Sequence, residues 1–201
     1  MKIQQPPLRN QSFTGERVYS HSGEFSPQQT DIVIPGRNLN FRFVRTYRSF
    51  KIDNLGLLGR GWSYNYDRRL EMSGENILYL DGKGRSFIFE KGKGDSYKTP
   101  KEMYCELVKE GNFLIQKYRY GTNQIFELPE QGGRLVKIID KNNNSLNFTY
   151  EQHKIVISDT LGRKITLKLN KGIISELKDF ANRIWKYIYD ENHCLIEIQR
   201  P

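Results

Sequence analysis

Hydrophobic and polar residues alternate with a period of two along most of the chain. In the segment 40–47, Phe41 and Phe43 fall on one side of an extended backbone and Arg42 falls on the other. Runs of the same kind, separated by clusters of Gly or Asn, occupy 77–80, 86–90, 113–118, 124–128, 135–139, 146–150, 155–158, 164–169 and 173–177. Short runs with such boundaries are typical of half-buried strands. The pattern therefore predicts a chain that is nearly all β.

The C-terminal third of the chain contains an internal repeat. Asp140, Asp159 and Asp179 are 19 and 20 residues apart, and large apolar residues follow each of them six, eight and ten positions later. The position three residues after each Asp holds Asn143, Gly162 and Asn182. The first two apolar positions of the three copies hold Leu146, Phe148, Ile165, Leu167, Trp185 and Tyr187. A more distant copy begins at Asp81.

Turn chemistry explains this spacing. Asp favours the first position of a type I turn, where its carboxylate accepts a hydrogen bond from the backbone two residues on. Gly and Asn tolerate the positive φ that the chain needs three residues later to rejoin an antiparallel partner. Each unit is thus predicted to be a hairpin whose returning strand places its apolar residues on one side of the sheet. Consecutive hairpins form a ribbon with one apolar face, which must curl or stack to bury that face.

One segment, 180–189, also suits a helix, because Ile184 and Ile188 lie four residues apart beside Trp185. The repeat argues for a strand at this place. The predicted fold class is all-β, with tandem antiparallel hairpins forming part of a curled sheet.

Composition and charge narrow the possible functions. The 201 residues include 12% aromatic side chains, which argues against general disorder. We find neither a long apolar stretch nor the apolar core of a secretory signal, so we expect a cytoplasmic location until a dedicated system exports the protein. The net charge of +9 is diffuse: its densest part, 31–70, has eight basic residues against three acidic ones, or +5. Without a recognisable motif, this charge does not predict nucleic-acid binding.

Candidate chemistry is sparse. His21 and His153 have no neighbours at catalytic or metal-ligating spacing, and His193 has only the adjacent Cys194. Cys105 and Cys194 are expected to be free thiols, with one long-range disulfide as the alternative. We therefore expect no enzymatic activity, no cofactor and no metal site.

Five segments upstream of the repeat carry a family resemblance. They are 31–36 (DIVIPG), 44–49 (VRTYRS), 58–63 (LGRGWS), 67–70 (DRRL) and 81–85 (DGKGR). In this order and spacing they resemble the domain that precedes the repeats in bacterial RHS, or YD-repeat, proteins, and Tyr189-Asp190 matches the YD pair itself. Arg48 departs from the pattern, since that family more often has Asn there, and we expect the difference to affect a surface turn.

The resemblance implies a structural role. RHS proteins build a hollow β-sheet shell that encloses a C-terminal toxin domain in bacterial polymorphic toxin systems, which serve interbacterial competition. The expected partners are the rest of the shell and its enclosed toxin, or another chain that completes the last hairpin; we expect no nucleic-acid partner and no insertion into a membrane.

The resemblance and the repeat together suggest a division of the chain. We expect a polar tail at 1–16, an RHS-associated β domain at 17–95, connecting hairpins at 96–133 and tandem repeats at 134–201. The last repeat is expected to be incomplete, because its next turn would begin near Arg200.

A carbohydrate- or cell-surface-binding β module is the alternative function. It would use aromatic side chains to stack on a glycan, and the candidates are Trp62, Tyr118, Tyr120, Tyr187 and Tyr189. Tyr187 and Tyr189 share repeat positions with aliphatic residues that have no ligand chemistry. These shared positions favour packing in the sheet over glycan binding.

Overall fold

The computed structural model describes residues 18–19 and 22–201, which form antiparallel strands almost throughout. The expected tail at 1–16 and His21 lie outside the described residues. The all-β fold class is confirmed, and the segment that also suited a helix contains a strand at Ile184–Tyr189. In the part of the chain that the structure describes, no helix has the length and apolar character needed to cross a membrane.

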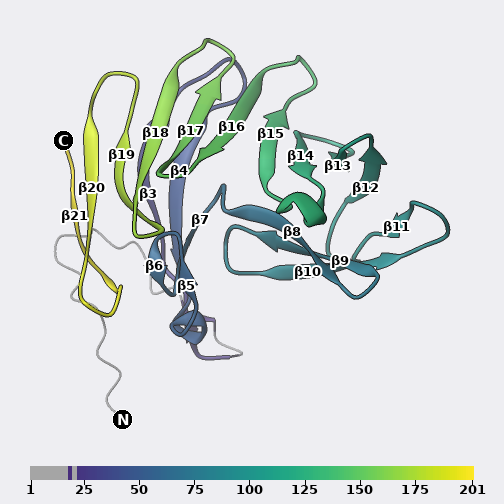
Figure 1. Cartoon of the computed structure of the whole chain (residues 1–201), viewed down its shortest axis with the longest axis horizontal. Coiled ribbons are helices and arrows are strands. Elements are labelled where there is room, and N and C mark those ends of the chain that lie inside the picture. The colour runs from purple at the N-terminus through teal and green to yellow at the C-terminus, as the bar shows by residue number, and fades with distance from the viewer. Residues whose placement is uncertain (1–17, 20–21) are drawn as a thin grey trace.

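A ten-stranded sheet contains the repeat (Figure 1). Every strand in it pairs antiparallel with the next strand along the chain. The strands are β12 (Cys105–Glu110), β13 (Phe113–Tyr118), β14 (Asn123–Glu127), β15 (Leu135–Ile139), β16 (Ser145–Glu151), β17 (Lys154–Asp159), β18 (Lys164–Asn170), β19 (Ile173–Lys178), β20 (Ile184–Tyr189) and β21 (Leu195–Gln199). The sheet therefore includes both the predicted connecting hairpins and the predicted repeats.

The N-terminal region forms smaller sheets. A three-stranded sheet consists of β3 (Gln28–Ile34), β4 (Phe41–Tyr47) and β7 (Trp62–Tyr64), and a four-stranded sheet consists of β8 (Arg68–Ser73), β9 (Asn76–Asp81), β10 (Ser86–Lys91) and β11 (Tyr97–Lys98). Two-stranded sheets are formed by β1 (Val18–Tyr19) with β2 (Glu24–Phe25) and by β5 (Leu55–Gly56) with β6 (Gly59–Arg60). Two short 3-10 helices occupy Ser49–Lys51 and Pro129–Gln131.

The core lies between the N-terminal sheets and one face of the ten-stranded sheet. Phe43 of β4 packs on Tyr187 of β20 with ring centroids 6.0 Å apart. Tyr79 of β9 makes an edge contact with Phe126 of β14 at 6.0 Å. Figure 1 shows β3 and β4 running alongside β16–β18, with β8–β10 lying across the β12–β15 end. The N-terminal region thus covers the face that the alternating pattern makes apolar.

Three bulges recur in the ten-stranded sheet. The pairing register shifts between β14 and β15, between β18 and β19, and between β20 and β21. In two of these places a tyrosine hydroxyl donates to a carbonyl at the bulge: Tyr150 to Leu135 at 2.8 Å and Tyr189 to Ile174 at 2.7 Å. Both tyrosines stand ten residues after a repeat Asp. They satisfy a carbonyl at the place where the bulge disturbs the ladder.

Candidate functional site

The repeat aspartates each hold a turn of the same geometry. Asp140, Asp159 and Asp179 begin the turns from β15 to β16, from β17 to β18 and from β19 to β20. In every copy, Oδ1 accepts hydrogen bonds from the backbone N–H groups two and four residues on, at 2.8 to 2.9 Å. The pKa of the Asp140 carboxyl is held below its usual value, first by the hydrogen bond from the Asn144 side chain and further by these backbone donors. The carboxylates are therefore structural acceptors.

The third residue after each Asp is left-handed in all three turns. Asn143, Gly162 and Asn182 have φ values of 62°, 77° and 63°. Arg163 and Arg183, the residues that follow the last two, donate from Nε to the Asp Oδ2 at 2.7 Å. The Arg183 side chain is half exposed, so its ion pair contributes at most about 1 kcal/mol. The backbone hydrogen bonds and the positive φ define the turn.

The same turn occurs at Asp190, where sequence reasoning placed only a connection. Asp190 accepts from the backbone N–H groups of Asn192 at 3.0 Å and Cys194 at 2.8 Å. The residue at the left-handed position is His193, with φ 61°. We missed this copy because we expected Gly or Asn three residues after the Asp. The available signal was the Asp itself, which stands at the end of a strand with His193 three residues later.

The predicted inner stripe lies in the core. None of its six side chains is more than 6% exposed: Leu146, Phe148, Ile165, Leu167, Trp185 and Tyr187. Phe148 packs on Tyr66 of the N-terminal region with ring centroids 5.2 Å apart. The stripe is therefore the surface on which the N-terminal sheets dock.

A buried polar cluster joins the three-stranded sheet to β20. Arg45 is 1% exposed, and its Nε donates to Asp31 at 2.6 Å while Nη2 donates to Asp31 and to Gln29. Tyr187 donates its hydroxyl to the same Asp31 carboxylate at 3.0 Å. The Arg45 guanidinium lies 4.8 Å from the centre of the Trp62 ring. Burial raises the pKa of the Tyr187 phenol well above its usual range, and the Asp31 charge adds to this rise. A buried ion pair depends on such partners, because removing one of them would leave a charged group unpaired inside the apolar core.

The LGRG segment, 58–61, lies at one edge of the contact between the N-terminal region and the ten-stranded sheet. We call this edge the docking rim. The backbone N–H of Arg60 donates to the carbonyl of His193 at 3.0 Å, and the Arg60 Nε donates to the carbonyl of Asn192 at 2.9 Å. Gly59 has φ 84°, and a Cβ on it would lie 2.4 Å from the His193 carbonyl oxygen and 2.9 Å from the Tyr189 ring. A glycine is required here both by conformation and by the close approach of the two backbones.

Other rim contacts come from further along the sheet. The backbone N–H of Leu70 donates to the carbonyl of Gly133 at 2.8 Å. The Arg163 Nη2 donates to the carbonyl of Pro35 at 2.6 Å. The N-terminal region is thus fixed to the ten-stranded sheet through backbone carbonyls at several points, in addition to apolar packing.

Arg48 is not a surface-turn residue, which corrects the expectation. Its side chain is 18% exposed and forms an ion pair with Glu24, which is 3% exposed. Its guanidinium also lies over the Tyr19 ring, 5.8 Å from the centroid. The sequence does not reveal this partner, because Glu24 lies 24 positions earlier in the chain. Arg48 instead ties β2 to the end of β4.

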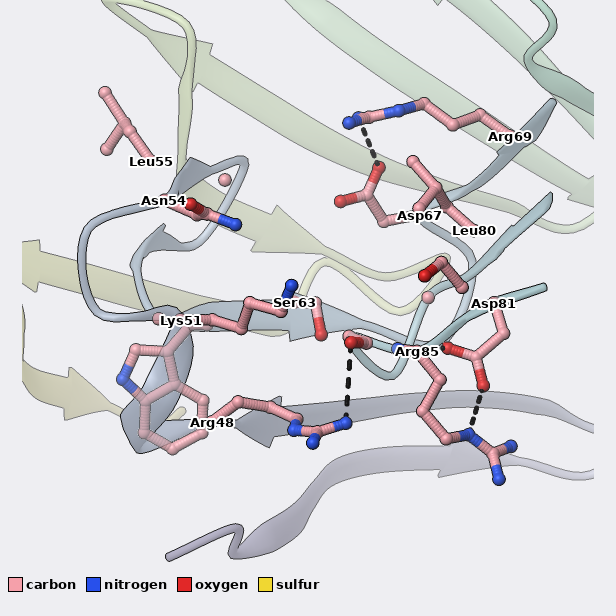
Figure 2. Close-up of a pocket in the computed structure, with 16 residues that line it drawn as sticks. Arg48, Lys51, Asn54, Leu55, Ser63, Asp67, Arg69, Leu80, Asp81 and Arg85 are labelled. Atoms are coloured by element: carbon pink, nitrogen blue, oxygen red, sulfur yellow. Dashed lines mark hydrogen bonds and ion pairs between the residues drawn. The ribbon is translucent and has the colours of Figure 1, made fainter. Parts of the chain in front are cut away.

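An open cleft lies beside these contacts (Figure 2). Its volume is about 180 Å³, and it is lined by residues that include Arg48, Lys51, Asp67, Arg69 and Asp81. Figure 2 shows Arg69 directed toward Asp67 and Arg85 directed toward Asp81. Burial raises the pKa of the Asp67 carboxyl, and the positive charge of Arg69 opposes the rise. Three basic side chains of the cleft already have acidic partners: Arg48 pairs with Glu24, Arg69 with Asp67 and Arg85 with Asp81.

The remaining candidate residues are dispersed. Trp62 and Tyr187 are buried in the core, whereas Tyr120 is 83% exposed. The two cysteines are free thiols, Cys105 buried and Cys194 partly exposed. Within the described ranges, no group of three or more His, Cys, Asp or Glu side chains could hold a metal ion.

The geometry thus describes N-terminal sheets docked on one face of a ten-stranded sheet, and comparisons with known proteins add to it. Residues 15–89 match the family model described as a domain of unknown function, DUF6531. The tRNA3(Ser)-specific nuclease WapA of Bacillus spizizenii and the tRNA nuclease WapA of Bacillus subtilis are each 28% identical to the chain over 129 residues. That match covers 64% of this chain but 5% of the relatives' length. Together these findings support an RHS-like protein.

Proposed function

We propose that the chain is a structural segment of an RHS-type β-shell. In this proposal the ten-stranded sheet is part of the wall, and the N-terminal sheets plug one end of it. The complete shell would enclose a C-terminal toxin domain and help to deliver it in a bacterial polymorphic toxin system. The segment itself would carry out no reaction.

One observation carries this proposal: a single apolar face continues across ten antiparallel strands and is covered by the N-terminal region. Alternation of side chains gives the sheet one dry face and one wet face. On the wet side, Lys168 pairs across the strands with Glu176, and Glu176 pairs with Lys186. A wall around a cargo needs this difference between its two faces.

The comparisons support the proposal from a second side. The relatives' names describe nucleases, and the matched region is 5% of their length. We propose that any such activity belongs to another part of a larger polypeptide. The contribution of this segment would be containment.

The wall role predicts that the sheet can be extended at β21. Within residues 18–19 and 22–201, β21 is paired on one side only, with β20. A peptide that copies 159–170, the Asp159 turn and β18, should add to this edge as a further strand. Hydrogen exchange should then show protection of the amides of Leu195–Gln199.

The matched control is the same peptide with serine in place of Ile165, Leu167 and Leu169. It keeps the turn and the backbone donors but lacks the apolar face, so it should give no protection. The wall role is rejected if both peptides protect β21 equally, or if neither does.

Containment is tested in the complete polypeptide that carries this segment. An amine-reactive reagent should label Lys168 and Lys186 on the wet face rapidly and the lysines of the enclosed domain slowly. Loosening the plug with Gly59→Ala should raise labelling of the enclosed domain. Rapid labelling of that domain in the unmodified polypeptide would contradict containment.

A further inference from the structure

A second cavity lies between the four-stranded sheet and the β12–β14 end of the large sheet, and it shares Asp81 and Arg85 with the cleft of Figure 2. Its volume is about 360 Å³, and its lining includes Arg68, Tyr79, Lys83, Tyr104, Tyr118 and Gln124. Its wall includes Tyr79, which also packs on Phe126, and the turn that Asp81 forms with Lys83 and Arg85.

The cavity contains an arginine whose ends are free. Arg68 donates from Nε to the carbonyl of Asn65 at 2.8 Å. Among the described residues, its two terminal nitrogens have no hydrogen-bond or ion-pair partner. Asp81, which lies directly across the strands from Arg68, is already bound by Arg85 at 2.7 Å. The guanidinium therefore presents an unused pair of donors, the geometry that fits a carboxylate.

Two phenols flank this guanidinium. The hydroxyls of Tyr79 and Tyr118 both meet the Gln124 side chain. Burial raises the pKa of Tyr118 to about 12, and the nearby positive charge of Arg68 acts in the opposite direction on both phenols. The Tyr79 hydroxyl already donates to the Gln124 carbonyl oxygen, which leaves the protonated Tyr118 hydroxyl as the phenol that can donate to a guest.

The polar layer behind the cavity is incomplete. Gln116 pairs with Gln124 across the strands, and its buried side-chain carbonyl has no partner in the part of the chain that the structure describes. Buried polar groups in folded proteins are nearly always satisfied. Gln116 itself does not line the cavity, and its carbonyl is an acceptor, so it takes no part in holding a carboxylate.

Charge and shape define the class of guest. The charged lining groups are three basic side chains, Arg68, Lys83 and Arg85, against two carboxylates, Asp81 and Glu102, which gives a net charge of +1. Tyr104 also lines the cavity, and its side chain is 86% exposed. A single negative charge matches the lining, and an apolar or planar body would meet the Tyr104 ring.

We propose that this cavity binds a monocarboxylate with an apolar body, with its carboxylate on Arg68 and its body against Tyr104. The proposal does not depend on the shell role. The chemistry that recognises the guest is the arginine fork, the Tyr118 hydroxyl and the single surplus positive charge.

The test is a titration of the isotope-labelled protein with benzoate, followed by NMR at the amides of Tyr118 and Gln124. Benzoate should cause saturable shifts, and its neutral isostere benzamide should not. Arg68→Met should weaken benzoate binding by about tenfold or more, because it removes the charged donors. Arg69→Met is the matched control: Arg69 is the next residue on β8 but lines the other cleft, so binding should be retained.

Tyr104→Ala tests the contact with the apolar body of the guest independently of the contact with its carboxylate. This side chain is so exposed that its loss cannot unfold the protein, and it should weaken benzoate binding by about threefold while leaving acetate binding unchanged. The proposal is overturned if benzamide binds as well as benzoate, if the Arg68 and Arg69 variants bind alike, or if benzoate gives no saturable shift.

Discussion

A close approach between the N-terminal region and the large sheet, at Gly59, provides the sharpest prediction. Gly59 and Gly162 both have positive φ, 84° and 77°. A Cβ on Gly162 would meet nothing within 4 Å, whereas one on Gly59 would lie 2.4 Å from the carbonyl oxygen of His193. Replacing each by Ala therefore applies the same backbone strain in both places, and only Gly59→Ala adds a clash at the docking rim.

The two expected losses differ several-fold. A left-handed Ala costs about 1 to 2 kcal/mol, and the stiffer unfolded chain returns about 0.4 to 1 kcal/mol. Gly162→Ala should therefore destabilise by about 1 kcal/mol. At Gly59 the clash must push the backbones apart and weaken the two hydrogen bonds of Arg60 to His193 and Asn192, each worth about 1 kcal/mol. With an overpacking cost of about 1 to 3 kcal/mol, Gly59→Ala should lose about 3 to 5 kcal/mol.

Urea unfolding followed by tryptophan fluorescence measures both variants, since Trp62 and Trp185 are buried in the core. In thermal unfolding the same losses correspond to about 2 to 4 °C for each kcal/mol. Equal destabilisation of the two variants would refute the reasoning, because it would mean that the rim contact contributes nothing.

Three further predictions test other contacts. Tyr187→Phe should lose about 1 to 2 kcal/mol in urea unfolding, because the Asp31 carboxylate loses a buried donor; no change would show that the bond is not made. Arg163→Ala should destabilise by about 1 to 2 kcal/mol through its carbonyl contact to the N-terminal region, and Arg183→Ala by less than about 1 kcal/mol; the reverse order would contradict the docking role. The pKa of Glu24 is lowered from 4.5, first by the hydrogen bond from Arg48. The wild type should therefore have a larger free energy of unfolding than Glu24→Gln above pH 4.5, and this stability gap should shrink as the pH falls through the lowered pKa. Urea midpoints across acid pH give this gap, and a gap independent of pH would argue against the ion pair.

Local patterns were enough to predict the strands and the repeat. The all-β class follows from alternation, and the turn at Asp159 follows from residue types that lie within five positions of each other. The segment 184–189 shows the value of the repeat, because its helix-compatible spacing was outweighed by its alignment with two other copies. Each of these inferences uses only contacts between near neighbours in the chain.

Contacts between distant segments could not be predicted in this way. The Arg45 cluster joins β3 to β20 through a hydrogen bond between residues 156 positions apart. Arg48 was misplaced for the same reason, since Glu24 is its partner only after folding. Gly59 could be recognised as part of a family motif, but the carbonyl that it approaches belongs to a turn that the repeat pattern did not include.

The turns therefore have two roles, which explains why their sequences differ. The turn at Asp179 has only local contacts for its arginine, whereas Arg163 of the Asp159 turn reaches the carbonyl of Pro35. At Asp190 the left-handed residue is His193, and its carbonyl accepts from Arg60. A left-handed residue turns its carbonyl out of the ladder, so the turn offers an acceptor to a second sheet without opening its own hydrogen bonds. The same local geometry thus both reverses the strand and anchors the N-terminal sheets, and the side chains vary where anchoring is added.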